Sequence, residues 1–401
     1  MIRHVAVVLA AIVVVIGCTA GGPILAAPSA PVPSIAPPTD PPLAVADPLP
    51  VVLPRDDGPH DRLTEWWYYT GHLEGRAADG SSHEFGFEYV IFRAERGSFP
   101  TTWASHLAIT DETGDRFLYA QRLEVGEGVD RSRRDADGTP SGFDLALTGV
   151  DPADETTLHR PAWRMTGSDG RDDLSASLST AEATAAGSPR GLGLRLAIGQ
   201  RKPPALHDRD GWIDFGPAGG SYYYSRTAMD AAGTITLDGA DMRVTGTAWF
   251  DHQWGDFISV GGGGWDWFAV NLDDGTDLTL SLVRDADGSY PLIYGTVVDP
   301  DGTTRHLERD AFTVEVTDHW TSPATGAEYP AGWTIRIPGE DDLHIELRPT
   351  VAAQELDTRA TTGVIYWEGS QVVGGTRAGA PIGGKAYVEL TGYAPSGIAG
   401  P

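Results

Sequence analysis

The sequence contains a single cysteine among 401 residues, Cys18, so no disulfide can form within the chain. Beyond its first residues it has no apolar run long enough to cross a bilayer as a helix. Basic residues are also few: 29 Lys and Arg stand against 56 Asp and Glu, a net charge of -27. Because so acidic a surface repels phosphate backbones, we expect no nucleic-acid partner.

Several motifs of metal, nucleotide and hydrolase sites are absent too. None of the 11 histidines forms a His-x-x-x-His pair, so the spacing predicts no zinc site. No Gly-x-Ser-x-Gly elbow occurs, and the glycine run 261–264 lacks the lysine of a phosphate-binding loop. The acidic segment 273–277 has calcium-type ligands, but a hairpin turn explains it better. We therefore expect neither a metal nor a cofactor.

The N-terminus has the pattern of an export signal. A short basic start is followed by the apolar run 5–16, and then by Gly17 and Cys18. Residues 1–17 resemble a bacterial lipoprotein signal with Cys18 as the lipidation site; an ordinary secretory signal with an incidental cysteine is the alternative. Residues 18–53 are rich in Pro and Ala and lack aromatics, which predicts a disordered tether. We expect an exported monomer, anchored by lipid on the outer face of the bacterial cytoplasmic membrane.

The remaining chain has the alternation of antiparallel β structure. Apolar residues recur at every second position in segments 84–93, 278–283, 333–337 and 343–347. Asp-Gly turns lie between such segments, and helical periodicity is scarce. These features predict an all-β fold built as antiparallel barrels or sandwiches.

A faint internal repeat divides the folded part. Residues 66–75 resemble residues 265–275, because each stretch opens with aromatics and runs through an acidic glycine turn into an alternating strand. The repeat favours two similar β domains, with a boundary near Lys202. We expect an N-terminal domain at 54–205 and a C-terminal domain at 206–401.

The segment from Trp249 to Phe268 is the best candidate for a site. Residues 249–256 and 264–268 together hold three acids, one imidazole and four indoles. Ionisable groups beside tryptophan lie in a poor solvent for charge, so their pKa values can move toward working pH. An apolar pocket with a few polar groups is therefore expected here.

Several motifs, taken in order, resemble one family. They are 65–71, 85–93, 222–225, 244–255, 265–268, 366–369 and 384–393. Over roughly residues 55–393 the sequence resembles the AttH/CrtC family, lipocalin-like proteins that include carotenoid 1,2-hydratase (hydroxyneurosporene synthase). The resemblance implies two lipocalin-like β-barrels with a pocket near their junction, and chemistry on apolar polyenes. The residues that match are Asp251, His252, Trp254, Trp265 and Asp266. The sequence differs at Gln253, where the family often has an acid.

Water addition to an alkene requires an acid, a stabilised cation and a base. Asp266 between two tryptophans is our candidate acid, since burial would raise its pKa. His252 is the candidate for holding the incoming water, and Asp251 for orienting His252. In an extended strand Asp266 and its neighbouring indoles face opposite ways unless a bulge intervenes. Alternatively, His252 is structural and Asp251 a turn acid.

Other residues are candidates for contacting a ligand. The indoles of Trp254, Trp265 and Trp267 could stabilise a cation through their faces, although each could equally be core. Further candidates are Glu65, Trp67, Tyr223, His106 and Glu368. For Glu65 we favour a structural pair with an arginine such as Arg93, because an acid enclosed in a barrel is normally paired.

Three functions remain open from the sequence. The first is a cofactor-independent enzyme that adds water to, isomerises or cyclises an apolar small molecule such as a terpenoid, polyene or lipid. The second is a lipoprotein that binds and carries such a ligand without catalysis, and the third is a structural envelope lipoprotein. The enzyme hypothesis predicts that Asp266 and His252 converge on one pocket, whereas the carrier hypothesis predicts an apolar pocket without them.

Overall fold

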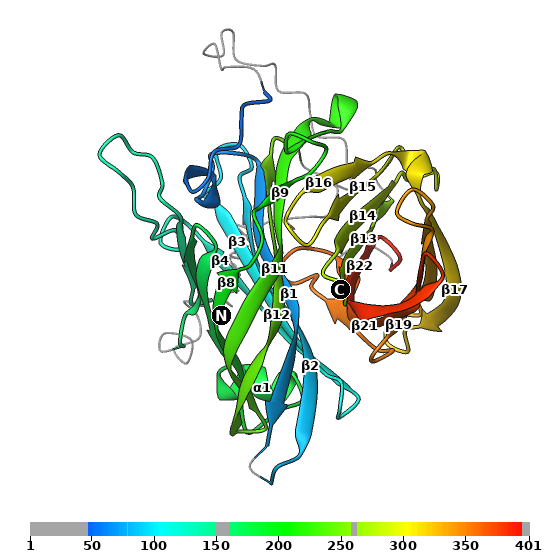
Figure 1. Cartoon of the computed structure of the whole chain (residues 1–401). Coiled ribbons are helices and arrows are strands. Elements are labelled where there is room, and N and C mark those ends of the chain that lie inside the picture. Colours follow the sequence, from blue (N-terminus) through cyan, green and yellow to red (C-terminus); the bar gives the residue numbers. More distant parts are fainter. Residues whose placement is uncertain (1–46, 78, 150–159, 258–262, 395–401) are drawn as a thin grey trace, which may run out of the picture.

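The computed structural model describes residues 47–77, 79–149, 160–257 and 263–394. The expected signal at 1–17, its lipidation site Cys18 and most of the tether lie outside these residues. Within them the chain folds into two curled antiparallel sheets that lie side by side (Figure 1). The prediction of an all-β fold with two antiparallel barrel-like domains is confirmed.

The first sheet has 12 strands. The connections of this part of the chain contain the short α-helix α1 (Thr180–Ala185) and the 3-10 helices Arg55–Asp57 and Gly216–Ala218. The strands of the first sheet are β1 (Thr64–Arg76), β2 (Ser82–Ala94), β3 (Thr102–Asp111), β4 (Arg116–Val125), β5 (Phe143–Leu147), β6 (Trp163–Ser168), β7 (Arg171–Ser177), β8 (Leu192–Gln200), β9 (Ala205–Leu206), β10 (Trp212–Asp214), β11 (Gly220–Leu237) and β12 (Ala240–Gly255).

The second sheet has 10 strands. They are β13 (Gly264–Leu272), β14 (Asp277–Arg284), β15 (Leu292–Val298), β16 (Thr304–Leu307), β17 (Thr313–Thr321), β18 (Glu328–Ile337), β19 (Leu343–Pro349), β20 (Glu355–Asp357), β21 (Ile365–Arg377) and β22 (Ala380–Thr391).

The two sheets repeat one topology. In the first, β1 pairs with β2 on one side and with the last strand, β12, on the other. In the second, β13 pairs with β14 and with the last strand, β22. The strands β1 and β13 contain the two halves of the repeat found in the sequence, so the similar sequences occupy equivalent places.

Each sheet encloses its own apolar core. Inward residues of the first sheet include Trp67, Tyr69 and Phe250, all with no exposed surface. Inward residues of the second include Phe268 and Trp333. A third buried cluster lies between the sheets and draws on both. Figure 1 shows why, since β13 and β22 lie beside the long strands β1, β11 and β12.

The change from the first sheet to the second comes later in the chain than the domain boundary that the sequence analysis predicts. β11 and β12 pair in the first sheet, so the change of sheet falls between Gly255 and Gly264, not at 205/206. The folded part also includes residues 47–53, which the sequence analysis places in the tether. Asp47 forms an ion pair with Arg62 at 2.8 Å and accepts a hydrogen bond from Tyr222 Oη at 2.7 Å.

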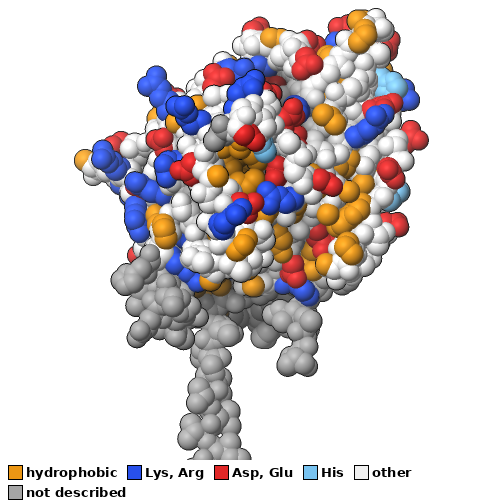
Figure 2. Space-filling view, turned by 90° about the horizontal axis from the view of Figure 1, so that it is seen from below, with side chains coloured by type: hydrophobic (Ala, Val, Ile, Leu, Met, Phe, Trp, Pro, Cys, Tyr) orange, Lys and Arg blue, Asp and Glu red, His pale blue; other side chains and the backbone are white. Residues whose placement is uncertain are grey.

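The described surface mixes charges of both signs. On the face seen in Figure 2, acidic and basic side chains are interspersed, and hydrophobic side chains are grouped between them. Among the described residues, no helix has the length and hydropathy that a membrane span requires.

Candidate functional site

Strand alternation places a set of outward side chains between the two sheets. On β1 and β12 the outward positions include Tyr68, Trp249 and Asp251, while their neighbours point into the first barrel. On β13 and β22 they include Trp267 and Tyr387. We call this region, buried between the outer faces of the sheets, the junction. Strands that are apolar on both faces are expected where a second layer covers them.

Two fully buried glutamates face the junction. Glu88 on β2 and Glu368 on β21 both have 0% exposure. Tyr68 Oη donates to Glu368 Oε1 at 2.6 Å, and Tyr366 Oη donates to Glu88 Oε1 at 3.4 Å. Among the described residues, neither carboxyl has a hydrogen-bond partner for its Oε2. Since buried polar atoms are normally bonded, these two oxygens are candidates for contacting a ligand or water.

Desolvation raises the pKa of both carboxyls well above the usual range. Neighbouring Glu389 and Glu88 add to the shift of the Glu368 pKa, and Glu389 adds to that of Glu88. Burial therefore favours the protonated form of both carboxyls. Glu389 on β22 keeps part of its surface exposed, and desolvation by the surrounding protein still raises its pKa to about 7.

Asp251 lies on the first-sheet side of the junction. Its carboxylate accepts hydrogen bonds from Tyr223 Oη at 2.5 Å, from Trp249 Nε1 at 2.7 Å and from Ser225. Trp267 Nε1 in turn donates to Tyr223 Oη at 2.9 Å. Burial raises the pKa of Asp251 to about 6, and the three donors oppose that rise. Asp251 is therefore mostly ionised at neutral pH.

The junction thus combines Glu368, whose protonated form is favoured by burial, with Asp251, which is mostly ionised at neutral pH. The charge of Asp251 contributes to the raised pKa of Glu368, which means that the two groups interact electrostatically. Titratable groups whose environments separate their pKa values are the usual arrangement of an acid and a base in an enzyme.

His106 reaches the junction from β3. Its Nδ1 lies 2.7 Å from Tyr366 Oη, and its Nε2 lies 3.0 Å from Thr361 Oγ1. Burial lowers the pKa of His106 to about 3, so the ring is neutral. Tyr366 consequently connects His106 to Glu88. The structure brings together at the junction these predicted residues: Asp251, Trp265, Trp267, Tyr223, His106 and Glu368.

Four other predicted residues, Glu65, Trp67, His252 and Trp254, lie inside the first barrel. Glu65 Oε1 is 3.0 Å from His252 Nε2 and 2.7 Å from His60 Nδ1. The expected pairing of Glu65 with Arg93 is wrong. Arg93 stands opposite Glu65 in the strand register, yet its guanidinium binds Glu95 because the two imidazoles already occupy the Glu65 carboxylate.

Asp266 faces the interior of the second sheet. The pairing of β13 is regular, so no bulge turns Asp266 toward its neighbouring indoles. Tyr393 Oη lies 3.0 Å from both carboxylate oxygens, and Arg284 Nη2 lies 3.3 Å away. Desolvation raises the pKa of Asp266 to about 6, and Arg284 opposes the rise. Asp266 is therefore mostly ionised at neutral pH, which does not suit a proton donor.

The structure corrects the expected convergence of the three catalytic candidates. Asp251 and His252 are neighbours on β12, so one faces the junction and the other the barrel interior. Asp251 binds Tyr223, Ser225 and Trp249 instead of orienting His252. Asp266 lies in a third place, inside the second sheet.

Sequence reasoning missed Glu88, Tyr68, Tyr366, Glu389 and His60. A signal for Glu88 was present. Phe85, Phe87 and Tyr89 define the inner face of β2, but Val90 and Phe92 make the other face apolar as well. An acid on a strand buried on both faces cannot be an ordinary solvent-facing residue.

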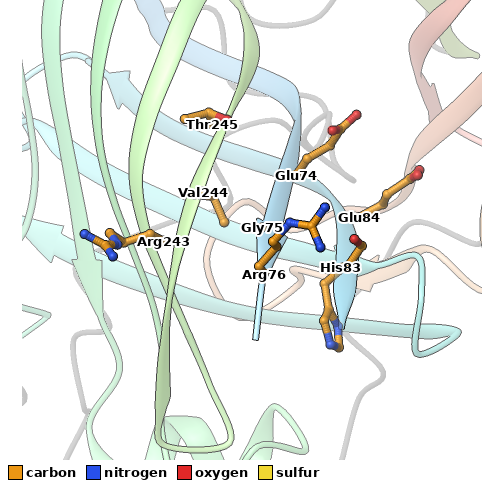
Figure 3. A pocket seen from close by; sticks show the side chains of 9 residues that line it. Glu74, Gly75, Arg76, His83, Glu84, Arg243, Val244 and Thr245 are labelled. Carbon is orange, nitrogen blue, oxygen red and sulfur yellow. The ribbon is translucent and has the colours of Figure 1, made fainter. Parts of the chain in front are cut away.

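A separate hollow of about 520 Å³ opens at the far ends of β1, β2 and β12 (Figure 3). Its lining includes Glu74, Arg76, His83, Glu84 and Arg243, most of which are exposed. None of the predicted site residues lines it. Because its lining carries solvated charges of both signs, this hollow suits an apolar ligand less well than the junction does.

Comparisons with known proteins agree with this architecture. The chain is similar to the AttH candidate NE1406 from Nitrosomonas europaea, with 29% identity and a TM-score of 0.70, over 88% of this chain and 99% of that one. It is also similar in fold to kievitone hydratase from Nectria haematococca, with 13% identity and a TM-score of 0.56, over 85% and 93%. A search of curated proteins gives no match. The model of the AttH-like family matches residues 44–393, and the chain therefore belongs to that family.

Proposed function

We propose that the chain is an enzyme that performs acid–base chemistry at the junction on an apolar unsaturated small molecule, without a cofactor there. One observation carries the proposal. Glu368 is fully buried, burial raises its pKa well above the usual range, and its Oε2 has no partner among the described residues. Such a carboxyl can donate a proton, and its apolar surroundings would also accommodate an apolar substrate.

The proposed reaction begins with proton transfer from Glu368 to one carbon of a double bond. The acid's O–H bond breaks, a C–H bond forms, and positive charge develops on the neighbouring carbon. The faces of Trp267, Trp249 and Tyr68 would stabilise this cation by roughly 0.5–2 kcal/mol each.

Three outcomes can follow from the cation. Water adds to it and gives up a proton to ionised Asp251, which completes a hydration. Loss of a different carbon-bound proton to Asp251 gives an isomer. Attack by a second double bond closes a ring and moves the positive charge to another carbon, which then loses a proton to Asp251. In each case Asp251 returns the proton to Glu368. Because one relative in fold is a hydratase, water addition is the first reaction to assay.

The test begins with the ligand. Full-length protein is purified from its own host, and native mass spectrometry with solvent extraction identifies any bound molecule. That compound is then incubated with the wild type, with Glu368→Gln and with the control Glu74→Gln, whose side chain is exposed. We expect Glu368→Gln to reduce turnover by at least about 100-fold while ligand binding remains, because only the proton donor is lost. Turnover equal to wild type in a folded Glu368→Gln protein would exclude the assignment.

A carrier without catalysis is the second candidate. The separation of Asp266 from His252 favours this candidate, because the enzyme hypothesis predicts that the two residues converge on one pocket. A carrier would release its extracted ligand unchanged after prolonged incubation, and Glu368→Gln would change only affinity.

We also propose that the protein is an exported lipoprotein held at the membrane by acylated Cys18. The support is the sequence pattern of residues 1–18. Cys18→Ser should move the protein from the membrane fraction to the soluble fraction. If both forms fractionate alike, Cys18 is not the anchor.

A further inference from the structure

We propose that His60, Glu65 and His252 bind a divalent transition-metal ion of the zinc class inside the first barrel, at a site distinct from the junction. One ligand atom from each residue lies within 4.8 Å of the other two. His60 comes from the loop before β1, Glu65 from β1 and His252 from β12. Trp67 pairs with His252 in the register of β1 and β12, and this places Glu65 and His252 as diagonal neighbours on one face.

The donor set and its spacing suit zinc. Two imidazoles and a carboxylate are the protein ligands of many zinc sites that keep a fourth position for water. Glu65 Oε1 lies 2.7 Å from His60 Nδ1 and 3.0 Å from His252 Nε2. Ligand atoms around a tetrahedral zinc are roughly 3.3 Å apart, given bonds of about 2 Å. Shifts of a few tenths of an ångström would therefore admit the ion.

The orientation of both imidazoles is fixed by packing. His60 stacks on Trp254 with ring centroids 4.1 Å apart and parallel planes, and His252 stacks on Trp67 at 4.7 Å. On the far side of His60, Nε2 lies 3.6 Å from Asp56 Oδ1. A carboxylate behind the outer nitrogen of a histidine is a common feature of metal sites, where it sets the ring orientation.

His252 also differs from the other buried histidines in its hydrogen bonding. His106 and His207 each use both ring nitrogens in hydrogen bonds. His252 is fully buried as well, yet among the described residues its Nδ1 has no partner. Nε2 of His252 points at the Glu65 carboxylate at 3.0 Å, so it is the ring nitrogen placed to share the ion.

One ligand of the site is in contact with solvent, since the side chain of His60 is 19% exposed. Glu65 supplies negative charge to the ion, whereas the nearby Asp57 is already paired with Arg226. Because Asp251 and His252 project from opposite faces of β12, loss of the ion leaves the acid–base groups of the junction in place.

The experiment measures zinc binding by the full-length chain after chelator treatment. A chromophoric chelator competes for Zn²⁺, mass spectrometry counts bound metal, and circular dichroism confirms folding. We expect one zinc per chain in the wild type. His60→Gln removes a partly exposed ligand and leaves the Glu65–His252 contact, and it should weaken binding at least about 100-fold. The control His319→Gln, on exposed β17, should bind as the wild type does.

Cobalt gives a second measurement that needs no variant. A Co²⁺-loaded wild type should show the intense visible absorption of a four-coordinate ion with nitrogen and oxygen ligands. Absence of stoichiometric zinc, equal zinc affinity in folded His60→Gln, or only the weak spectrum of six-coordinate surface cobalt would each overturn the proposal.

Discussion

At the scale of single residues, the interior of the first barrel contains buried ionisable groups that interact with one another. Arg226 is 1% exposed, and its Nη2 lies 2.7 Å from Asp57 Oδ1. Asp172 lies in the same network, where its Oδ2 accepts a hydrogen bond from Tyr69 Oη at 2.9 Å. Desolvation raises the pKa of Asp172 to about 7, although Arg226 opposes the rise. Folding therefore favours the protonated form of this carboxyl.

This raised pKa predicts a pH dependence of stability. Because the folded pKa lies above the unfolded value, the stabilisation from protonated Asp172 is complete below about pH 4 and is lost as pH rises to about 7. The loss amounts to about 1.4 kcal/mol for each pH unit in that interval.

The side chain introduced by the substitution Asp172→Asn does not titrate. The unfolding free energy of the variant minus that of the wild type should therefore increase between about pH 5 and pH 7. Urea unfolding of both proteins at the two pH values measures this. A difference between variant and wild type that stays constant with pH would contradict the assigned pKa.

At the scale of elements, the strand β12 separates the predicted site residues onto its two faces. It pairs with β1 along nearly its whole length, so alternate residues serve the junction and the barrel interior. Close approach of the two strands needs a residue without a side chain at Gly246, where an added Cβ would lie 2.0 Å from the His72 carbonyl oxygen. A backbone atom cannot move aside as the end of a side chain can.

Gly246→Val should therefore destabilise the protein by about 1–3 kcal/mol through overpacking. The neighbouring Thr245→Val, at an exposed position, serves as the control and should stay within about 0.5 kcal/mol of wild type. Thermal or urea unfolding distinguishes them. Equal stability of the two variants would show that β1 and β12 can separate at this point without cost.

At the scale of the whole molecule, a buried ion pair joins the two sheets. Lys202 follows β8 in the first sheet, and its Nζ lies 2.6 Å from Asp277 Oδ2 on β14 of the second. Thr227 and Asn271 also donate to Asp277, each at 2.7 Å. The segment around Lys202, where the sequence analysis places a domain boundary, is thus a contact between the sheets.

Lys202→Met removes the charge at similar side-chain length. We expect a loss of about 3 kcal/mol, at the low end of the usual cost, because Thr227 and Asn271 still donate to Asp277. Arg201→Met, at a half-exposed neighbour, is the control with little expected effect. Urea unfolding followed by tryptophan fluorescence measures both. If Lys202→Met is as stable as Arg201→Met, the pair does not hold the sheets together.

Much of the fold follows from local pattern. The alternation in segment 84–93 predicts a strand, and the Asp-Gly turns predict antiparallel neighbours, because both depend on residues close in the chain. The same logic correctly separates Asp266 from its flanking indoles, since a regular strand allows nothing else. The repeat at 66–75 and 265–275 likewise marks equivalent strands of two similar sheets.

The class of the fold, the repeated topology and the richness of one segment in aromatic and acidic residues follow from the amino-acid order alone. Which of these residues meet depends on the tertiary structure. Tyr68 binds Glu368 across 300 positions of sequence, and His60 approaches His252 because β1 and β12 are paired. Such contacts depend on which strands pair and which faces pack. These are global choices, set by the burial of apolar surface over the whole chain, and no local spacing of residues encodes them.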